Sequence, residues 1–173
     1  MSNAYDIATQ LGVDTSTFVQ KDANGVIEAL DGSALTNLPA GGKVLQVVKV
    51  DQTTEVTASS SSFQTAIQAS ITPSSSSSKI LVMPSVQFNV PSTADASTFR
   101  IKRASTVIQE HQDQGAGGGF IKAMYSPTYL DSPASSSSTQ YEVLFNRTGG
   151  SGSVSTCTSN TSDSSLTLIE IEG

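Results

Sequence analysis

The sequence lacks tryptophan and contains one cysteine and one histidine among its 173 residues. A single cysteine, Cys157, cannot form an intrachain disulfide or a cysteine-based zinc site. The single histidine, His111, leaves few routes to histidine-dependent catalysis or to a multi-histidine metal site. No apolar run approaches the roughly 20 residues that a membrane helix needs. We therefore expect no metal, no cofactor and no membrane insertion.

Charged residues are also scarce, at 14%, and the formal net charge is −6. A nucleic-acid binder needs a basic face to neutralise phosphates, so this acidic balance argues against one. Serine and threonine instead make up about 28% of the chain, well above ordinary globular usage. The first residues show no basic and apolar signal-peptide pattern, so we expect synthesis in a cytoplasm without export.

Residues 1–42 differ in composition from the rest of the chain. They hold five acidic residues against one basic residue, and turn signals such as Asn24-Gly25 and Asp31-Gly32 interrupt them. A segment this short cannot bury a core by itself, so it is either a disordered tail or a segment that orders against partners. We predict an extended, mostly irregular N-terminal arm over residues 1–42 and a separate head domain over residues 43–173.

The head domain shows the period-two alternation of β-strands. In Lys79–Val90 every second residue from Ile80 to Val90 is apolar, which predicts a strand with one buried face. Pro84 interrupts this strand and cannot donate a ladder hydrogen bond, so it indicates an edge or a bulge. Further strands are expected at residues 43–50, 63–71, 98–103, 120–125, 141–146, 154–158 and 166–171.

Serine- and glycine-rich stretches separate these strands, for example Ser74–Ser78 and Gly115–Gly119. Such stretches cannot pack a core and predict surface loops. Several short strands with turns between them predict an all-β fold, an antiparallel β-sandwich of the jelly-roll type. Only 6% of the residues are aromatic, so the core is thin for its length and we expect the domain to self-associate.

The residue types that could carry chemistry do not form a recognisable catalytic set. His111 has no nucleophile motif near it and is interpreted as a solvated loop histidine. The glycine run before Phe120 is not followed by the Lys-Ser/Thr of a phosphate loop. Cys157 is interpreted as a half-buried filler within a strand. The basic residues of Arg100–Arg103 are too few to hold a nucleic acid.

Carboxylates are the remaining catalytic option. A glycosidase needs two of them about 5 to 10 Å apart, and the spacing of the 15 acidic residues does not reveal which ones converge. Asp95, Glu110, Asp113 and Asp131 could bind Ca²⁺, but none lies in an EF-hand type of loop. We predict that the protein is not an enzyme, with a glycan depolymerase as the less favoured alternative.

Several segments resemble fibre proteins of tailed bacteriophages. Asp31–Gly42 resembles a linker that precedes terminal β-domains in tail fibres, and Lys43–Val48 resembles the first strand of small fibre-head domains, of marine phages especially. Three later segments, Ile71–Val82, Tyr129–Ala134 and Ser165–Ile171, resemble parts of these heads in the same order. The resemblance extends over residues 31–173.

The resemblance implies a virion structural protein with a trimeric jelly-roll head, similar in style to complement C1q and tumour-necrosis-factor heads. It implies attachment to other virion proteins through the N-terminus, where Tyr5, Ile7, Leu11 and Phe18 are the candidate anchoring residues, and adsorption to a host surface through the head. Tail fibres usually have a long shaft, which residues 1–42 do not provide. A head fibre or capsid decoration protein is therefore the alternative to a short tail or neck fibre.

A homotrimer would allow three arms to bury apolar residues around a shared axis; these are Val26, Ile27, Leu30, Leu35 and Leu38. Three heads would also raise the avidity for a repetitive host glycan. We expect any glycan contact on the loops Gln109–Phe120 and Tyr125–Tyr129, because binding residues concentrate on loops; the candidates are His111, Gln112, Phe120, Tyr125 and Tyr129. The alternative is that their aromatic rings pack the trimer interface.

Overall fold

The computed structural model describes residues 42–91, 96–115, 119–157 and 164–173. Within these ranges the fold is all-β, and no helix there is long and apolar enough to cross a membrane. The nine residues predicted to anchor the arm or to line a trimer axis all precede residue 42, so they lie outside the described residues. The strands are β1 (Val44–Gln52), β2 (Val56–Ala58), β3 (Gln64–Ile71), β4 (Lys79–Val90), β5 (Ala96–Arg103), β6 (Thr106–Gly115), β7 (Ile121–Tyr125), β8 (Tyr129–Asp131), β9 (Thr139–Phe145), β10 (Val154–Thr156) and β11 (Ser164–Ile171).

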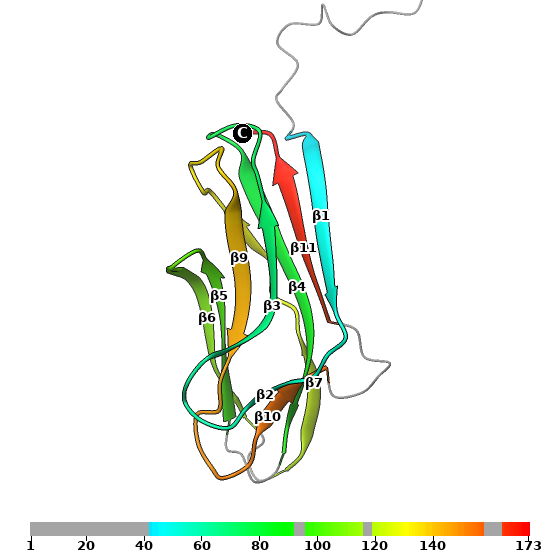
Figure 1. Ribbon diagram of the computed structural model, residues 1–173, viewed down its shortest axis with the longest axis vertical. Coiled ribbons are helices and arrows are strands. Elements are labelled where there is room, and N and C mark those ends of the chain that lie inside the picture. Colours follow the sequence, from blue (N-terminus) through cyan, green and yellow to red (C-terminus); the bar gives the residue numbers. More distant parts are fainter. Residues whose placement is uncertain (1–41, 92–95, 116–118, 158–163) are drawn as a thin grey trace, which may run out of the picture. The chain divides into compact units, whose positions relative to one another are not determined.

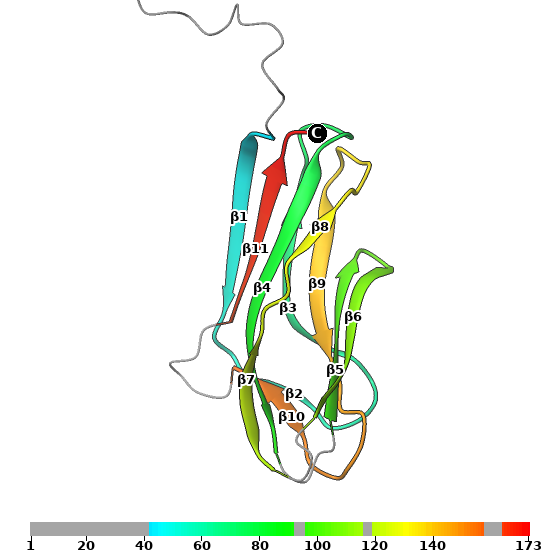
Figure 2. The same cartoon turned by 180° about the vertical axis from the view of Figure 1, so that it is seen from behind.

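The strands form two antiparallel sheets, which Figures 1 and 2 show from opposite sides. The larger sheet has seven strands in the order β1-β11-β4-β10-β2, with β7 and β8 paired to β4 as well. The smaller sheet has the order β3-β9-β5-β6. The chain crosses repeatedly from one sheet to the other, because β3 and β4, β4 and β5, β6 and β7, and β8 and β9 belong to different sheets. This connectivity confirms the predicted jelly-roll sandwich.

Strand β4 is the centre of the larger sheet and not an edge strand, but at Pro84 it has a paired neighbour on one side only, as the predicted edge requires, and no bulge. Leu166 of β11 lies opposite Pro84, whereas on the other side the pairing with β8 ends at Val82 and the pairing with β7 begins at Val86. The backbone N–H of Gln87 points toward β11, where it donates to Ser164. Since N–H groups alternate between the two edges of a strand, the position of Pro84 faces the gap between β7 and β8, where no donor is needed.

The core lies between the two sheets and is built by alternation. Every second residue of β4 from Ile80 to Val90 is buried, as predicted, and Tyr141, Val143 and Phe145 of β9 face it from the smaller sheet. The scarce aromatic residues are concentrated here. Phe99 stacks on Tyr125 and on Phe145, with ring centroids 4.5 and 5.9 Å apart. Although aromatic residues are few, their side chains contact one another and form one continuous cluster that joins the two sheets.

Three strands were not predicted, namely β2, β6 and β8. The largest omission is β6, which covers most of the expected loop Gln109–Phe120. It pairs with β5 through a turn in which Ala104 adopts a positive φ of 49°. That conformation usually requires glycine or asparagine, so the sequence carries no hairpin signal at this position. The predicted loop at Ser74–Ser78 does lie between strands, whereas Gly115, the first residue of the predicted glycine loop, belongs to β6 and residues 116–118 lie outside the described ranges.

Candidate contact surfaces

The outer face of the larger sheet carries a row of apolar side chains across four strands. Val47 of β1 lies opposite Ile169 of β11, Ile169 lies opposite Leu81 of β4, and Leu81 lies opposite Leu130 of β8. Residues that pair directly across strands share one face of the sheet. Val47 and Leu130 are 57% and 49% exposed, and the two residues between them are half-buried. We call these four residues the apolar row.

Further exposed apolar side chains belong to the same sheet. Among the described residues, eight large hydrophobic side chains are well exposed, and six of them lie on strands of the larger sheet. Besides Val47 and Leu130 these are Val44, Leu45, Met83 and Met124. Monomeric proteins rarely expose a contiguous apolar patch of more than a few hundred Å² unless it makes a contact. The larger sheet therefore presents a candidate contact surface.

The outer face of the smaller sheet carries ion pairs beside two apolar residues, the exposed Val107 and the half-buried Leu144. The guanidinium of Arg100 forms an ion pair with Glu110 and lies 3.9 Å from the centre of the Phe63 ring. Hydrogen bonds from Gln112 and Arg100 lower the pKa of Glu110. Lys102 and Glu142, 3.8 Å apart, form a second pair on this face. These polar side chains suit a face that meets water.

An ion pair joins the two sheets. Arg103 of β5 donates to both carboxylate oxygens of Asp131 on β8, at 2.7 and 2.9 Å, and to the carbonyl oxygen of Ser132 at 3.2 Å. The hydroxyl of Tyr141 on β9 donates to the same carboxylate at 2.7 Å. Burial and this bond to Asp131 raise the pKa of Tyr141. The cluster holds the short strand β8 against the smaller sheet.

His111 does not lie in a solvated loop, which corrects its predicted environment. It is half-buried in β6 opposite Phe99, and its Nδ1 lies 2.9 Å from the hydroxyl oxygen of Tyr125 on β7. Tyr125 is itself only 5% exposed, and burial raises its pKa. The pair is thus a second polar connection between the sheets. No nucleophile or further titratable group contacts it among the residues that the structure describes.

The five predicted receptor residues occupy different environments. Phe120, just before β7, is 59% exposed, and Gln112 in β6 is exposed and donates to Glu110. Tyr129 begins β8 and is half-buried against the core, and Tyr125 is buried beside His111. The expected loop Tyr125–Tyr129 is therefore only the short connection from β7 to β8. Receptor contact itself stays a prediction, and Phe120 and Gln112 are the exposed members of this set.

Glu170 is a fully buried carboxylate near the end of β11. It accepts hydrogen bonds from the backbone N–H and the hydroxyl of Ser74, at 2.7 and 2.6 Å, and from the side-chain amide of Gln46 at 2.6 Å. Burial opposes its ionisation, but these bonds outweigh the penalty and lower its pKa to about 2. The side chain fixes the loop after β3 to strands β1 and β11, which is a structural role.

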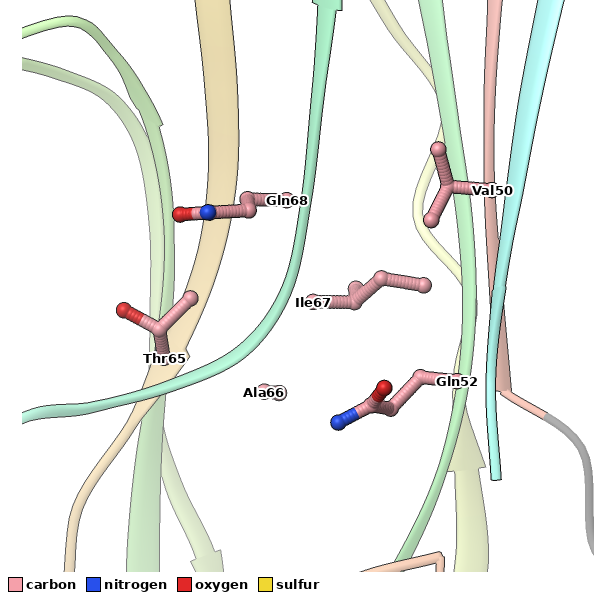
Figure 3. Close-up of a pocket in the computed structure, with 6 residues that line it drawn as sticks. All are labelled: Val50, Gln52, Thr65, Ala66, Ile67 and Gln68. Atoms are coloured by element: carbon pink, nitrogen blue, oxygen red, sulfur yellow. The ribbon is translucent and has the colours of Figure 1, made fainter. Parts of the chain in front are cut away.

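An open pocket of about 360 Å³ lies between β1 and β3. In Figure 3, Val50 and Gln52 of β1 point toward β3, and Ile67 points back toward them, whereas Thr65 and Gln68 point away. None of the six lining residues is titratable. The pocket therefore offers apolar surface and neutral amides but no acid, base or nucleophile.

Cys157 follows β10 and is not part of a strand, contrary to the prediction. It is buried, adopts a positive φ of 55°, and its thiol donates toward the carbonyl oxygen of Gln52 at 3.2 Å and the hydroxyl of Ser164 at 3.0 Å. These contacts connect the end of β10 to β1 and β11. Across the described ranges, no group of three or more His, Cys, Asp or Glu residues could hold a metal ion.

Comparisons with known proteins give a distant likeness of fold. No family model and no curated protein sequence matches the chain. Among solved structures, it is similar to the VP2 subviral particle of infectious bursal disease virus, with a TM-score of 0.42 and 12% identity over 73% of this chain and 39% of that one. The virus structure of the Gx strain gives the same score and identity over 36% of its chain. The chain thus spans well under half the length of these proteins.

Proposed function

We propose that this chain is a structural protein of a tailed-phage virion. In this proposal it is a short homotrimeric fibre or spike that attaches to other virion proteins through residues 1–42 and presents the sandwich head for adsorption to a host surface. Synthesis takes place in the cytoplasm of the host bacterium. The head takes no cofactor and carries out no catalysis.

The observation that carries the proposal is where the phage-like segments fall in the fold. The linker-like segment ends at Gly42, two residues before β1 begins. Ile71–Val82 spans the end of β3, the serine loop and the start of β4, and Ser165–Ile171 is strand β11. Each segment therefore corresponds to a strand or a junction of one sandwich, as the resemblance to fibre heads implies.

The ion pairs of three carboxylates in the described part of the chain support a role without catalysis. Asp131 is paired with Arg103, Glu110 with Arg100, and Glu142 with Lys102. A glycosidase needs one carboxyl group free to give up a proton and a second facing it across a cleft. Carboxylates that are held in ion pairs, within a sheet or between sheets, are poorly suited to donate a proton or to act as the second catalytic group.

Labelling of purified virions tests the proposal. An antibody against the head domain, imaged by electron microscopy, is expected to mark the tail or neck of the particle. Label on the capsid shell would instead establish a head fibre or capsid decoration protein. Virions without the protein would overturn the structural role. Incubation with host capsular polysaccharide should release no reducing ends, and measurable release would establish a depolymerase.

A further inference from the structure

We propose that the free edge of β1, with the pocket beside it, binds residues 26–30 of a neighbouring copy of this chain as an added strand. The inference rests on the proposed homotrimer and names the surface that receives apolar residues of the arm. Residues 1–41 lie outside the described ranges and directly precede the segment that leads into β1. The arm is therefore the occupant, and β1 together with β3 forms the site.

The side of the sandwich at β1 and β3 has two strand edges without a paired neighbour. Within the described ranges β1 pairs only with β11, and β3 pairs only with β9. An edge strand presents a row of unpaired N–H and C=O groups, which is a template for another extended segment. The pairing of β1 with β11 is regular from Gln46 to Gln52, so most of the strand offers this template. Lysines on an edge oppose strand addition, but Lys49 is already paired with Asp51 at 2.7 Å.

The pocket between β1 and β3 gives the side chains of an added strand a place to pack. Val50 and Gln52 of β1 point toward β3, and Ile67 points back toward them (Figure 3). Gln46 donates to the carbonyl oxygen of Thr72, just after β3, at 2.7 Å. Among the described residues, no hydrogen bond or ion pair joins β1 to β3 themselves. This side of the sandwich is therefore open.

The opposite side of the sandwich is closed by polar contacts. There His111 of β6 contacts Tyr125 of β7, and Arg103 of β5 pairs with Asp131 of β8. The opening at β1 and β3 is thus not a requirement of the architecture. Strand addition gains affinity from main-chain hydrogen bonds and specificity from pockets that take alternate side chains, and this side offers both.

Residues 26–30 have the chemistry that the site takes. Their sequence is Val-Ile-Glu-Ala-Leu. In an extended strand, Ile27 and Ala29 share one face, whereas Glu28 lies on the other. No charged side chain lines the pocket, and burying an unpaired charge is costly. The strand is therefore expected to direct Ile27 into the pocket and to leave Glu28 in water.

The length of the connection favours a neighbouring copy over the same chain. Residues 31–43 separate this segment from β1, which begins at Val44. The loops of β-hairpins usually have 2 to 5 residues, far fewer than this connection. An extended segment of this length spans about 40 Å, which suits a crossing to the next copy. When each copy passes its arm to the next, the contacts are head to tail and close into a ring, as a homotrimer requires.

The experiment is thiol cross-linking of the full chain at micromolar concentration. Ile27→Cys/Val50→Cys, treated with a short thiol cross-linker, is expected to give covalent species of two and three chains on a denaturing gel. The matched control Ile7→Cys/Val50→Cys moves the first cysteine to another isoleucine of the arm and should remain at the mass of one chain. Cys157 is buried and should not react.

Light scattering provides a second measurement. The wild type is expected to be oligomeric, and Ile27→Asp should weaken self-association by about tenfold or more, because it brings a charge to the uncharged pocket. Ile7→Asp should keep the wild-type mass. A monomeric wild type, cross-links confined to one chain, or an oligomer that Ile27→Asp leaves unchanged would overturn the inference.

The virion labelling is independent of both measurements. Labelled virions whose protein shows no cross-link between copies would overturn the inference and leave the proposed function standing. Cross-linked copies of a protein that virions lack would instead overturn the proposed function and leave the exchange of residues 26–30 standing.

Discussion

Arg103 and Asp131 lie in different sheets and are joined by two hydrogen bonds from one guanidinium nitrogen, at 2.7 and 2.9 Å. The Asp131 side chain is only 6% exposed, and the Arg103 side chain is 27% exposed. A pair of this kind is costly to break from one side, because the remaining partner keeps a buried charge without compensation. It therefore decides how firmly β8 is held.

Replacing the arginine tests this role. Arg103→Met is expected to lower the free energy of unfolding by about 3 kcal/mol, since Asp131 loses its counter-charge while staying buried. Chemical denaturation measures the loss. The control Lys43→Met removes a pair whose side chains are 77% and 45% exposed, and it should change stability by less than about 0.5 kcal/mol. Equal losses in the two variants would contradict the buried role of Arg103.

The lowered pKa of Glu170 predicts that the stability of the protein depends on pH. Its folded pKa of about 2 lies below the ordinary value of 4.5, so its ionised form stabilises the fold above pH 4.5, and this contribution disappears as the pH falls toward 2. Glu170→Gln should cost about 1 to 3 kcal/mol at neutral pH. Urea midpoints measured from pH 7 to pH 2.5 should converge for the two proteins. A constant difference over that range would contradict the prediction.

Tyr125 is expected to stabilise the fold in two separable ways, through the hydrogen bond of its hydroxyl and through the packing of its ring. Tyr125→Phe keeps the stacking on Phe99 but removes the hydrogen bond to His111, and should cost about 1 kcal/mol. Tyr125→Ala also removes the ring from the core and should cost about 3 to 5 kcal/mol. Thermal and urea unfolding give both values. Phe120→Ala, at an exposed position, should leave stability nearly unchanged and is the variant to test in host adsorption.

The backbone conformation of Ala104 predicts that substitution by glycine and substitution by valine have different effects on stability. Its φ of 49° lies in the left-handed region, where glycine is unstrained and a β-branched side chain is strongly disfavoured. Ala104→Gly should therefore leave stability unchanged or raise it by about 0.5 kcal/mol, because relief of strain is partly offset by the freedom of glycine in the unfolded chain. Ala104→Val should lower stability. Melting temperatures of the three proteins provide the comparison, and a more stable valine variant would contradict it.

Much of the sandwich could be predicted because its strands alternate strongly. Lys79–Val90 agrees with β4 residue for residue, since each apolar residue at an even position faces the core. Strand β6 could not be predicted, because its Gln109–Asp113 stretch is polar at every position. It is a strand because β5 pairs with it along one edge and because Tyr125 of the other sheet offers a partner to His111.

Part of the apolar row could be recognised in the sequence, because its residues are apolar at positions where period-two alternation leads one to expect a polar side chain. Val47 directly precedes Val48, Leu81 lies within the apolar run Ile80–Pro84, and Ile169 directly follows Leu168. A strand with apolar residues on both faces is typical of one covered on both sides. The sequence did not reveal that these runs are neighbours, because β1, β4 and β11 are far apart along the chain.

The sequence by itself determined that this protein is an all-β chain with serine loops, one buried face on its principal strands and no recognisable catalytic set, because those features depend on local composition and on a period of two. Only the tertiary structure decided which strands are neighbours. Pairing across long sequence separations brings Val47 to Leu130 through β11 and β4, and it gives Arg103 the buried partner Asp131. The apolar row, and with it the candidate contact surface, results from that pairing, since each strand contributes a single residue to the row.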